Sequence, residues 1–364
     1  MKSVILETKY QTTKPTRTCP YSMLLALTKT VRHNMKARFF SILIILTIAF
    51  SCSKKVIPKN DLTQANLNGE VKQVKSELYE LVQVNDTFEI GQQVNSRSFD
   101  RNEILVFNKE GNRVFKKEFL SNGKIENESE YRYEKGKLKK LIENDYYGRG
   151  STSISTYFYN QKDSISKIIY SNDNFERTVI FERNKGNRTI KQTYFVEDTI
   201  TGILIMKFDE NQNIIKKTKY KNENTPIQIV EKLYNRNNLI IEEKITDYND
   251  WGTLIDIVTY KNYQDEYPTE LENNSENTII ENIFKKNILI EYRIIPPPSD
   301  YRIITVQKFN HQENLTENLR IENGDTLDSW KFNYILDDKN NWIKKYSFKN
   351  YKPLTFTKRE IDYY

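Results

Sequence analysis

Short β-rich runs separated by polar turns recur along the chain from residue 69 to residue 364. In each unit an aromatic residue ends one run, a turn rich in Asn, Asp, Gly and Lys follows, and a new apolar run begins, as in residues 107–114, FNKEGNRV. These aromatic residues, which we call the anchor aromatics, are Phe107, Tyr133, Tyr159, Phe181, Phe208, Tyr234, Tyr248, Phe284, Phe309 and Tyr334. Their positions step by 26, 26, 22, 27 and 26 residues from 107 to 234 and by 25 and 25 from 284 to 334, and the unit at Tyr248 falls out of step between these two series. Such a period indicates a repeat protein.

A unit of this length accommodates two strands and two turns, so each repeat is expected to be a β-hairpin. Alternation with period two places Trp342, Tyr346 and Phe348 on one face of a strand and Lys345 and Ser347 on the other. An apolar face cannot stay in water, so the array must curl, pack as two layers or be covered. The predicted fold class is all-β, with tandem antiparallel β-hairpin repeats forming one long curved sheet or a solenoid-like shell.

The first segment of the array, residues 69–79 (GEVKQVKSELY), fits either a strand or an amphipathic helix. We interpret it as a strand that caps one end of the array, because no helix is convincing elsewhere. Lys, Glu and Asn at outward positions suit the protection that exposed edge strands need.

Composition supports a folded chain with little histidine or cysteine chemistry. Hydrophobic residues make up only 37%, but aromatic residues reach 12%, with 24 Tyr and 18 Phe, and disordered chains are poor in these residues. Two Cys and two His exclude a disulfide scaffold, a structural zinc cluster and most histidine-based catalysis.

The net charge of +7 comes from the N-terminal segment alone. Residues 1–51 hold eight Lys and Arg residues and one acidic residue, Glu7, so the rest of the chain is neutral with both signs interspersed. A protein that binds DNA or RNA concentrates positive charge in its folded part. We therefore expect no nucleic-acid partner.

The N-terminal region has the order of a bacterial export signal. Lys36 and Arg38 precede the apolar run 39–50, and Ser51 and Cys52 follow it. Twelve residues are too few for a helix that crosses a bilayer, which needs about 20. We expect residues 1–34 to be an over-extended start, 35–51 a signal peptide, 52–68 a polar tether and 69–364 the hairpin repeat domain.

Residues 49–52, AFSC, resemble a bacterial lipobox of the looser Bacteroidetes type, with Ala49 in place of the usual Leu. The resemblance implies cleavage between Ser51 and Cys52 and acylation of Cys52, which would hold the protein on a membrane through several acyl chains. With a start at Met35, His311 is the one histidine that the mature chain keeps. The expected location is the bacterial cell envelope, with lipid attachment to the outer membrane. Residues 53–55 lack the early acidic cluster of surface-export signals and favour the periplasmic face.

Candidate catalytic groups are few. His311 lies in a repeat turn, where a polar residue is expected in any case, and no second histidine or cysteine can complete a triad or a zinc site. The acidic pairs 209–210 and 337–338 also fall at turns, so turn chemistry explains them better than calcium binding. Residues 147–151 lack the remainder of a phosphate-loop motif, and the triplet 296–298 predicts a loop between hairpins. We expect no metal, no cofactor and no catalytic residues.

The surplus of tyrosine allows two interpretations. Rings on a rigid sheet can stack on sugars, but Tyr and Phe recur at the structural phase of the repeat, so we interpret them as core residues.

The repeat phrases are similar to those of the YD, or rearrangement-hot-spot, repeat superfamily, whose units centre on an aromatic residue, an Asp or Asn, and a turn Gly. The resemblance covers residues 99–364 and includes the closing segments 337–343 and 359–364. It implies an antiparallel hairpin array that wraps into a hollow shell in long members. Few units here keep the Gly, and no toxin domain or self-cleaving protease segment follows the array.

The sequence favours a non-enzymatic, lipid-anchored envelope protein whose repeat scaffold binds a protein or glycan partner. One alternative is a polysaccharide-active enzyme on a repetitive β fold, which would need two carboxylates about 5–10 Å apart across a groove. The other, implied by the resemblance alone, is a carrier or immunity protein that acts beside a toxin.

Overall fold

The computed structural model describes residues 60–96, 100–147, 150–249, 252–265, 267–274, 277–285, 288–296 and 303–364. These residues form one short helix, α4 (Asp61–Gln64), and a series of β-strands. The expected signal peptide, Ser51 and Cys52 lie outside the described residues.

The strands range from five residues in β3 to 14 residues in β1. The strands are β1 (Val71–Val84), β2 (Thr87–Gln93), β3 (Glu103–Phe107), β4 (Arg113–Phe119), β5 (Ile125–Glu134), β6 (Lys137–Asp145), β7 (Ser151–Tyr159), β8 (Ile165–Asn172), β9 (Glu176–Asn184), β10 (Thr189–Val196), β11 (Thr199–Phe208), β12 (Ile214–Tyr220), β13 (Pro226–Tyr234), β14 (Ile240–Asn249), β15 (Gly252–Gln264), β16 (Tyr267–Asn273), β17 (Thr278–Lys285), β18 (Ile288–Ile295), β19 (Ile303–Phe309), β20 (Leu315–Glu322), β21 (Asp325–Leu336), β22 (Trp342–Lys349) and β23 (Lys352–Tyr363).

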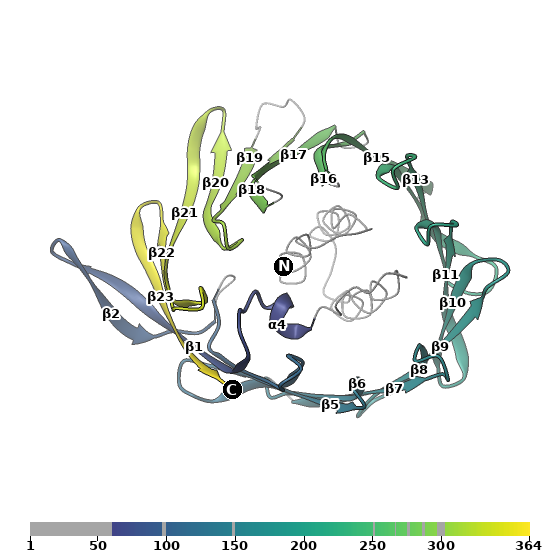
Figure 1. Ribbon diagram of the computed structural model, residues 1–364, viewed down its shortest axis with the longest axis horizontal. Coiled ribbons are helices and arrows are strands. Elements are labelled where there is room, and N and C mark those ends of the chain that lie inside the picture. Colours follow the sequence, from purple (N-terminus) through teal and green to yellow (C-terminus); the bar gives the residue numbers. More distant parts are fainter. Residues whose placement is uncertain are drawn as a thin grey trace.

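The strands form a closed ring (Figure 1). From β3 to β23 each strand pairs antiparallel with the next, as β3 does with β4 and β22 with β23. Strand β1 then pairs with β23 on one edge and with β3 on the other, which gives a closed barrel of 22 antiparallel strands in the described part of the chain. The all-β prediction is confirmed, and the prediction of an open curved sheet or solenoid is wrong, because pairing β1 on both sides satisfies both edges of the array.

The segment expected to cap the array is a strand, but it is not an edge. Val71 to Glu80 of β1 pair with β23 from Tyr363 to Thr355, whereas only Gln73 to Ser76 pair with β3. Strand β1 therefore joins the first and the last hairpins of the chain.

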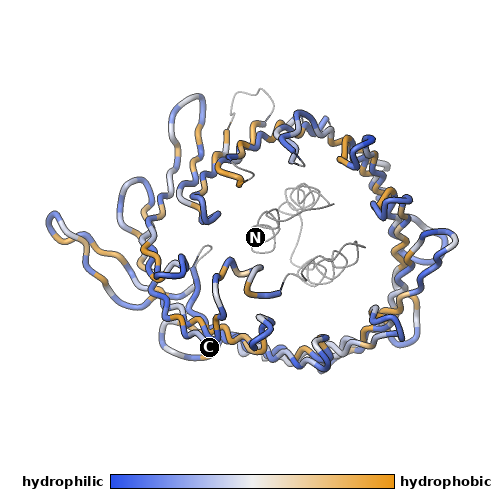
Figure 2. Tube along the Cα trace, in the orientation of Figure 1, coloured by the Kyte–Doolittle hydropathy of each residue, from blue (hydrophilic) through white to orange (hydrophobic). Residues whose placement is uncertain are grey.

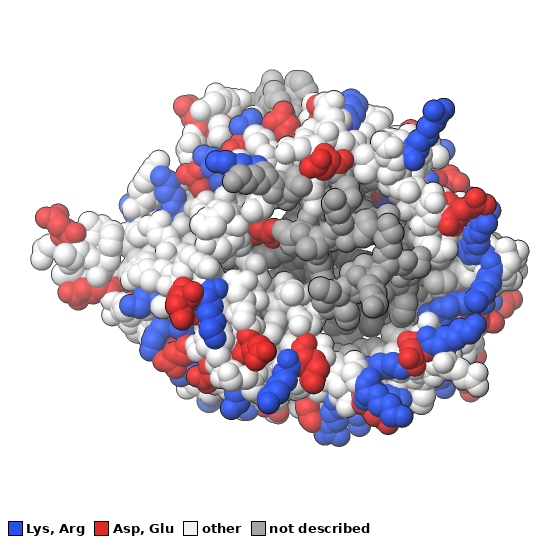
Figure 3. All heavy atoms as spheres, in the orientation of Figure 1, with Lys and Arg blue, Asp and Glu red and all other residues white. Residues whose placement is uncertain are grey.

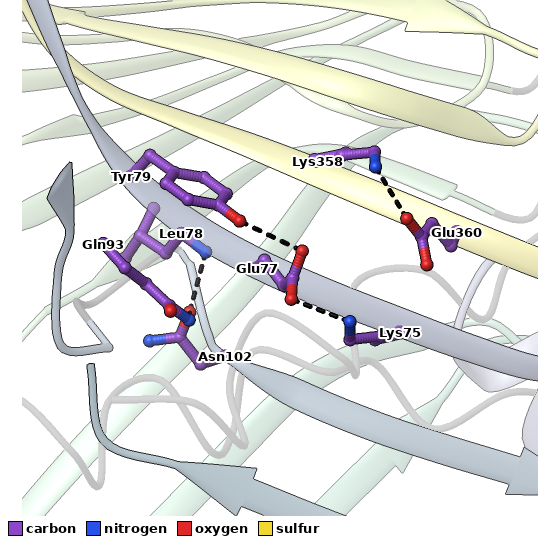
Figure 4. A network of polar contacts seen from close by, with 8 residues as sticks. All are labelled: Lys75, Glu77, Leu78, Tyr79, Gln93, Asn102, Lys358 and Glu360. Atoms are coloured by element: carbon purple, nitrogen blue, oxygen red, sulfur yellow. Dashed lines mark hydrogen bonds and ion pairs between the residues drawn. The ribbon is translucent and has the colours of Figure 1, made fainter. Parts of the chain in front are cut away.

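The second half of β1 leaves the ring and pairs with β2. The register shifts between Tyr79 and Leu81, and from there to Val84 the partner is β2. The chain returns from β2 to β3 through a connection that Asn102 fixes. The Asn102 side chain accepts a hydrogen bond from Leu78 N at 2.7 Å (Figure 4), and it donates one to Val94 O, also at 2.7 Å. The β1–β2 hairpin thus projects from the ring as an arm (Figure 1).

Helix α4 lies inside the ring (Figure 1) and identifies the inward face of the wall. Leu62 and Leu67 are buried against Val74, Leu105 and Phe107. Successive residues of a strand point to opposite faces, so Val74 and Leu105 and their cross-strand partners face inward all round the ring. Figure 2 shows the resulting alternation of hydrophobic and hydrophilic residues along the strands.

Residues 60–68 belong to the stretch expected to be a polar tether, yet they are docked on one end of the ring. Leu62 N donates to Gly111 O, Asn66 Nδ2 donates to Gln312 O, and Asn341 Nδ2 donates to Asn68 O. Gly111, Gln312 and Asn341 all lie in turns that join an odd-numbered strand to the next even-numbered one. We call this end of the ring the aromatic rim, because the anchor aromatics precede these turns.

Candidate functional site

The anchor aromatics connect each hairpin to the one before it. The hydroxyl of each anchor tyrosine except Tyr248 donates to a backbone carbonyl about 20 residues earlier, at the start of the preceding even-numbered strand. Tyr133, Tyr159, Tyr234 and Tyr334 donate to the carbonyls of Arg113, Leu138, Ile214 and Leu315 at 3.1, 2.8, 3.1 and 2.7 Å. In the unit of Phe181, Arg183 donates to Ile165 O at 2.8 Å instead. This recurrence explains why the anchor position carries a tyrosine in these units, and it gives these four tyrosines a structural role.

Tyr248 does not occupy the anchor position at the aromatic rim. It lies near the end of β14, at the rim opposite the aromatic rim, and its side chain is exposed. The residue that fills the position is Tyr263 in β15, whose hydroxyl donates to Ile240 O. Strand β15 has 13 residues, which moves this aromatic residue out of the regular spacing and hides it from a search by period.

The residue after the anchor aromatic organises the turn. Asn235 accepts hydrogen bonds from the backbone of Asn237 and Leu239 at 2.9 and 3.0 Å, and Asn310 makes the same pair of bonds with Gln312 and Asn314. This is the turn chemistry that favours Asn and Asp. The left-handed position of the turn is Gly111 in the first unit but Asn238 and Glu313 in later ones, so the left-handed conformation is kept where another residue replaces glycine.

The acidic pairs also belong to these turns. Asp209 Oδ1 accepts from Asn213 N, and Asp337 Oδ1 accepts from Lys339 N and Asn341 N. His311 lies exposed in the turn after Phe309. Within the described residues no group of three or more His, Cys, Asp and Glu side chains is placed to hold a metal ion.

The densest group of charged residues lies on the inward face where the ring closes. Lys345 Nζ lies 2.6 Å from Asp100 Oδ1, and both side chains are buried. Thr357 Oγ1 donates to the same carboxylate oxygen at 2.8 Å. Asp100 lies in the connection between β2 and β3, while Lys345 and Thr357 lie on β22 and β23. Polar contacts therefore connect the two sides of the closure across 257 residues of sequence.

We call the place where β1 closes the ring between β23 and β3 the seam. It holds a second cation and an aromatic ring. The Arg359 guanidinium lies 3.4 Å from the centre of the Trp342 ring, and Arg359 Nε donates to Ser76 Oγ at 3.3 Å. Burial lowers the pKa of Arg359 to about 10, and burial also lowers the pKa of Lys345. A buried cation needs a counter-charge or a ring face to remain stable, and this site supplies both.

A further polar group lies beside the seam, on β4 and in the connection that precedes β3. Glu118 forms ion pairs with Arg101 and with Lys116, the latter at 3.2 Å. Burial lowers the pKa of Lys116 to about 8. Across the ring, Lys232 and Glu243 form a buried ion pair at 2.6 Å, and the Tyr260 hydroxyl donates to the same carboxylate.

Along β22 the faces of the side chains differ at one residue from the alternation that the sequence predicts. Lys345 and Ser347 are buried on the inward face, while Tyr346 and Phe348 are on the outward face. Trp342 also faces inward, because a register shift leaves Ile343 without a cross-strand partner and changes the alternation of β22. The alternation was therefore wrong for Trp342 alone, which shares the face of Lys345 and Ser347, since the pattern carries no sign of the bulge.

The outward face of the wall is covered by exposed ion pairs. Cross-strand examples are Lys117–Glu128, Lys191–Glu182, Lys216–Glu231, Lys261–Glu272, Arg293–Glu281, Lys308–Glu317 and Lys331–Glu317. Near the seam, Lys75–Glu77 and Lys358–Glu360 continue this pattern on β1 and β23 (Figure 4). Figure 3 shows charged side chains of both signs along the outline of the molecule.

No helix among the described residues is long and apolar enough to cross a membrane. The sequence matches no protein-family model, and it is not similar to any curated protein.

Several solved structures are weakly similar to this chain. A Tc holotoxin pore of Photorhabdus luminescens is 9% identical with a TM-score of 0.39, covering 74% of this chain and 16% of the toxin chain. A porin-like protein from Bacteroides uniformis is 8% identical with a TM-score of 0.25, covering 81% of this chain and 98% of that one. A porin-like protein from Bacteroides vulgatus is 9% identical with a TM-score of 0.21 over the same shares. Similarity at this level gives no evidence of function, so the function is inferred from the residues of this chain.

Proposed function

We propose that this chain is a lipid-anchored envelope protein whose closed hairpin ring stands in water and binds a protein or glycan partner without catalysis. The observation that carries the proposal is the series of exposed ion pairs on the outward face. A barrel wall in lipid presents an apolar band about 25 Å tall, and a Lys or Arg at its middle costs about 2–4 kcal/mol. Ion pairs around the circumference suit a wall in water.

Lipid attachment at Cys52 would supply the contact with the membrane. The docked segment starts at Asn60, whose side chain donates to Glu110 O on the aromatic rim. Seven residues lie between Cys52 and Asn60, so the eight Cα–Cα steps of the chain would keep the acylated end within about 28 Å of this rim. The aromatic rim would face the membrane, and the opposite rim would face the partner.

The non-enzymatic part of the proposal rests on how the inward charges are used. Asp100, Glu118 and Glu243 each contact a cation on a neighbouring strand or connection. A general acid or base must be free to exchange a proton with a substrate. Groups held in such buried pairs stabilise the ring instead.

Phase partitioning tests the proposal. We expect the native protein to enter the detergent-rich phase of a Triton X-114 extract of host membranes, with N-terminal peptide masses that show acylated Cys52. The Cys52→Ala variant should lose acylation and be released from membranes by alkaline carbonate, while the matched Ser53→Ala variant, one residue away in the mature chain, should behave as the native protein does. Retention of an unacylated Cys52→Ala variant through carbonate extraction would contradict the proposal and support a wall embedded in lipid.

A further inference from the structure

The arm formed by residues 79–93 has no role in closing the ring. It consists of the second half of β1 and of β2, which follow a register shift between Tyr79 and Leu81. Bulges bend strands and redirect them. Gly91 permits this bend, since a Cβ at that position would come within 3.2 Å of both Glu80 and Val82. The geometry directs a two-stranded ribbon away from the wall (Figure 1).

The outer edge of the arm is an unpaired strand edge. Within the described residues β2 pairs with β1 alone, so the backbone groups on its other side point away from the sheet. Such an edge accepts an added strand, and proteins usually protect it with Lys, Pro or a covering element. Strand β2, TFEIGQQ, has neither Lys nor Pro.

The arm carries several apolar side chains that are exposed. Phe88 and Ile90 share one face of β2 and are 50% and 55% exposed, while Val82 of β1 is 43% exposed. Phe88 contacts the wall through an edge-on ring contact with Phe348, at 5.5 Å between centroids. Residues 85–90 are all exposed, so the free edge is accessible along most of its length.

The charge of the arm differs from that of the wall. Glu80, Asp86 and Glu89 are its charged residues, and residues 76–94 contain no Lys or Arg. On the wall, by contrast, acidic and basic residues alternate in pairs. Figure 3 shows only acidic charges at the tip of the arm. Like charges oppose pairing of two arms edge to edge, and a basic partner is favoured.

We propose that β2 binds an extended segment of a partner protein as an added strand, and that this segment alternates basic and apolar residues. Its apolar side chains would lie beside Phe88 and Ile90, and its Lys or Arg side chains beside Glu89 on the other face. This inference rests on the proposed role in partner binding, and it is independent of lipid attachment at Cys52.

A peptide-binding experiment tests the inference on the full-length protein purified from membranes in detergent. The probe is the labelled octapeptide KVKVKVKV, and the controls are EVEVEVEV and the block sequence KKKKVVVV. We expect binding of the alternating basic peptide alone, weakened by salt, with slower hydrogen exchange of the amides of β2. Equal binding of the block sequence, or protection elsewhere on the chain, would overturn the proposal.

Paired charge reversals make the test specific. The variant Asp86→Lys with Glu89→Lys should weaken binding of KVKVKVKV by about tenfold or more and allow binding of EVEVEVEV. The matched control is Asp173→Lys with Glu176→Lys, which has the same spacing on two exposed residues beside the β8–β9 turn. This control should bind within about twofold of the native protein. Equal losses in both variants would contradict an arm site, and an arm-dependent dimer without peptide binding would assign the edge to a second copy of the chain.

Discussion

Ion pairs of the same chemistry occur on both faces of the ring wall in opposite environments. The inward pair Lys232–Glu243 has side-chain exposures of 2% and 1%, whereas the outward pair Lys216–Glu231 has exposures of 42% and 45%. Their N–O distances are nearly equal, 2.6 and 2.9 Å. Distance therefore does not separate a pair that the fold depends on from one that solvent can replace.

The difference follows from desolvation. A buried charge that loses its partner keeps the full cost of leaving water, while an exposed one is simply hydrated again. Each buried inward pair should thus be necessary for the stability of the fold. Each outward pair alone should be dispensable, although the outward pairs together keep the wall soluble.

The strongest test of this contrast removes one partner of an inward pair. Lys232→Met leaves Glu243 buried without a counter-charge and should lower the free energy of unfolding by about 3–5 kcal/mol, measured by urea denaturation. The double variant Lys232→Met with Glu243→Leu should recover most of the loss, because no unpaired charge remains. A loss below about 1 kcal/mol in the single variant would show that water reaches the pair.

Alkaline pH tests the inward face through its tyrosines. Burial raises the pKa of Tyr157 to about 12, above the value near 10 of an unfolded chain. The folded state therefore holds this proton more tightly, so the contribution to stability is complete below pH 10 and is lost as pH rises to 12. The loss should reach about 2–3 kcal/mol for this residue. Tyr157→Phe should make stability less steep with pH over that window, and Tyr351→Phe, at an exposed position, should not.

The anchor hydroxyls provide a smaller effect. Tyr234→Phe removes one hydrogen bond to Ile214 O and should cost about 1 kcal/mol, seen as a lower urea midpoint at unchanged slope. Tyr248→Phe is the matched control, because Tyr248 occupies the opposite rim. Equal losses at the two positions would show that the hydroxyl bond does not connect the repeats.

The smallest effect is expected on the outward face. Lys216→Met breaks the pair with Glu231 and should change the free energy of unfolding by less than about 1 kcal/mol. A loss as large as that of Lys232→Met would mean that this part of the outward face is not open to water, and would count against the proposed function.

Local features of the fold could be predicted from the sequence because they depend on neighbouring residues. The turns after Phe208, Tyr234 and Phe309 are determined by the Asp or Asn that follows, and the side chain of that residue forms the turn bonds. Hairpin pairing between consecutive strands follows from the same short spacing. For this reason the all-β fold class could be predicted from the sequence.

Closure could not be predicted, because it depends on residues far apart in sequence. Ser76 pairs with Arg359, and no local pattern indicates which strand β1 will meet. Bulges conceal the orientation of side chains as well: one unpaired residue, Ile343, places Lys345 beside Asp100 on the inward face. The sequence around Asp100 does not indicate its ion pair with Lys345, since the connection between β2 and β3 is what brings Asp100 to the inward face. The seam was therefore missing from the sequence-based candidates.

The closure by β1 also limits how this architecture can change in length. An antiparallel ring closes only when its number of strands is even, and the 22 strands here meet that condition. Loss or gain of one strand would bring β1 alongside a parallel neighbour and leave its hydrogen bonds mismatched. Related chains should therefore differ by whole hairpins of about 26 residues, and insertions of other sizes should be confined to turns and to the arm.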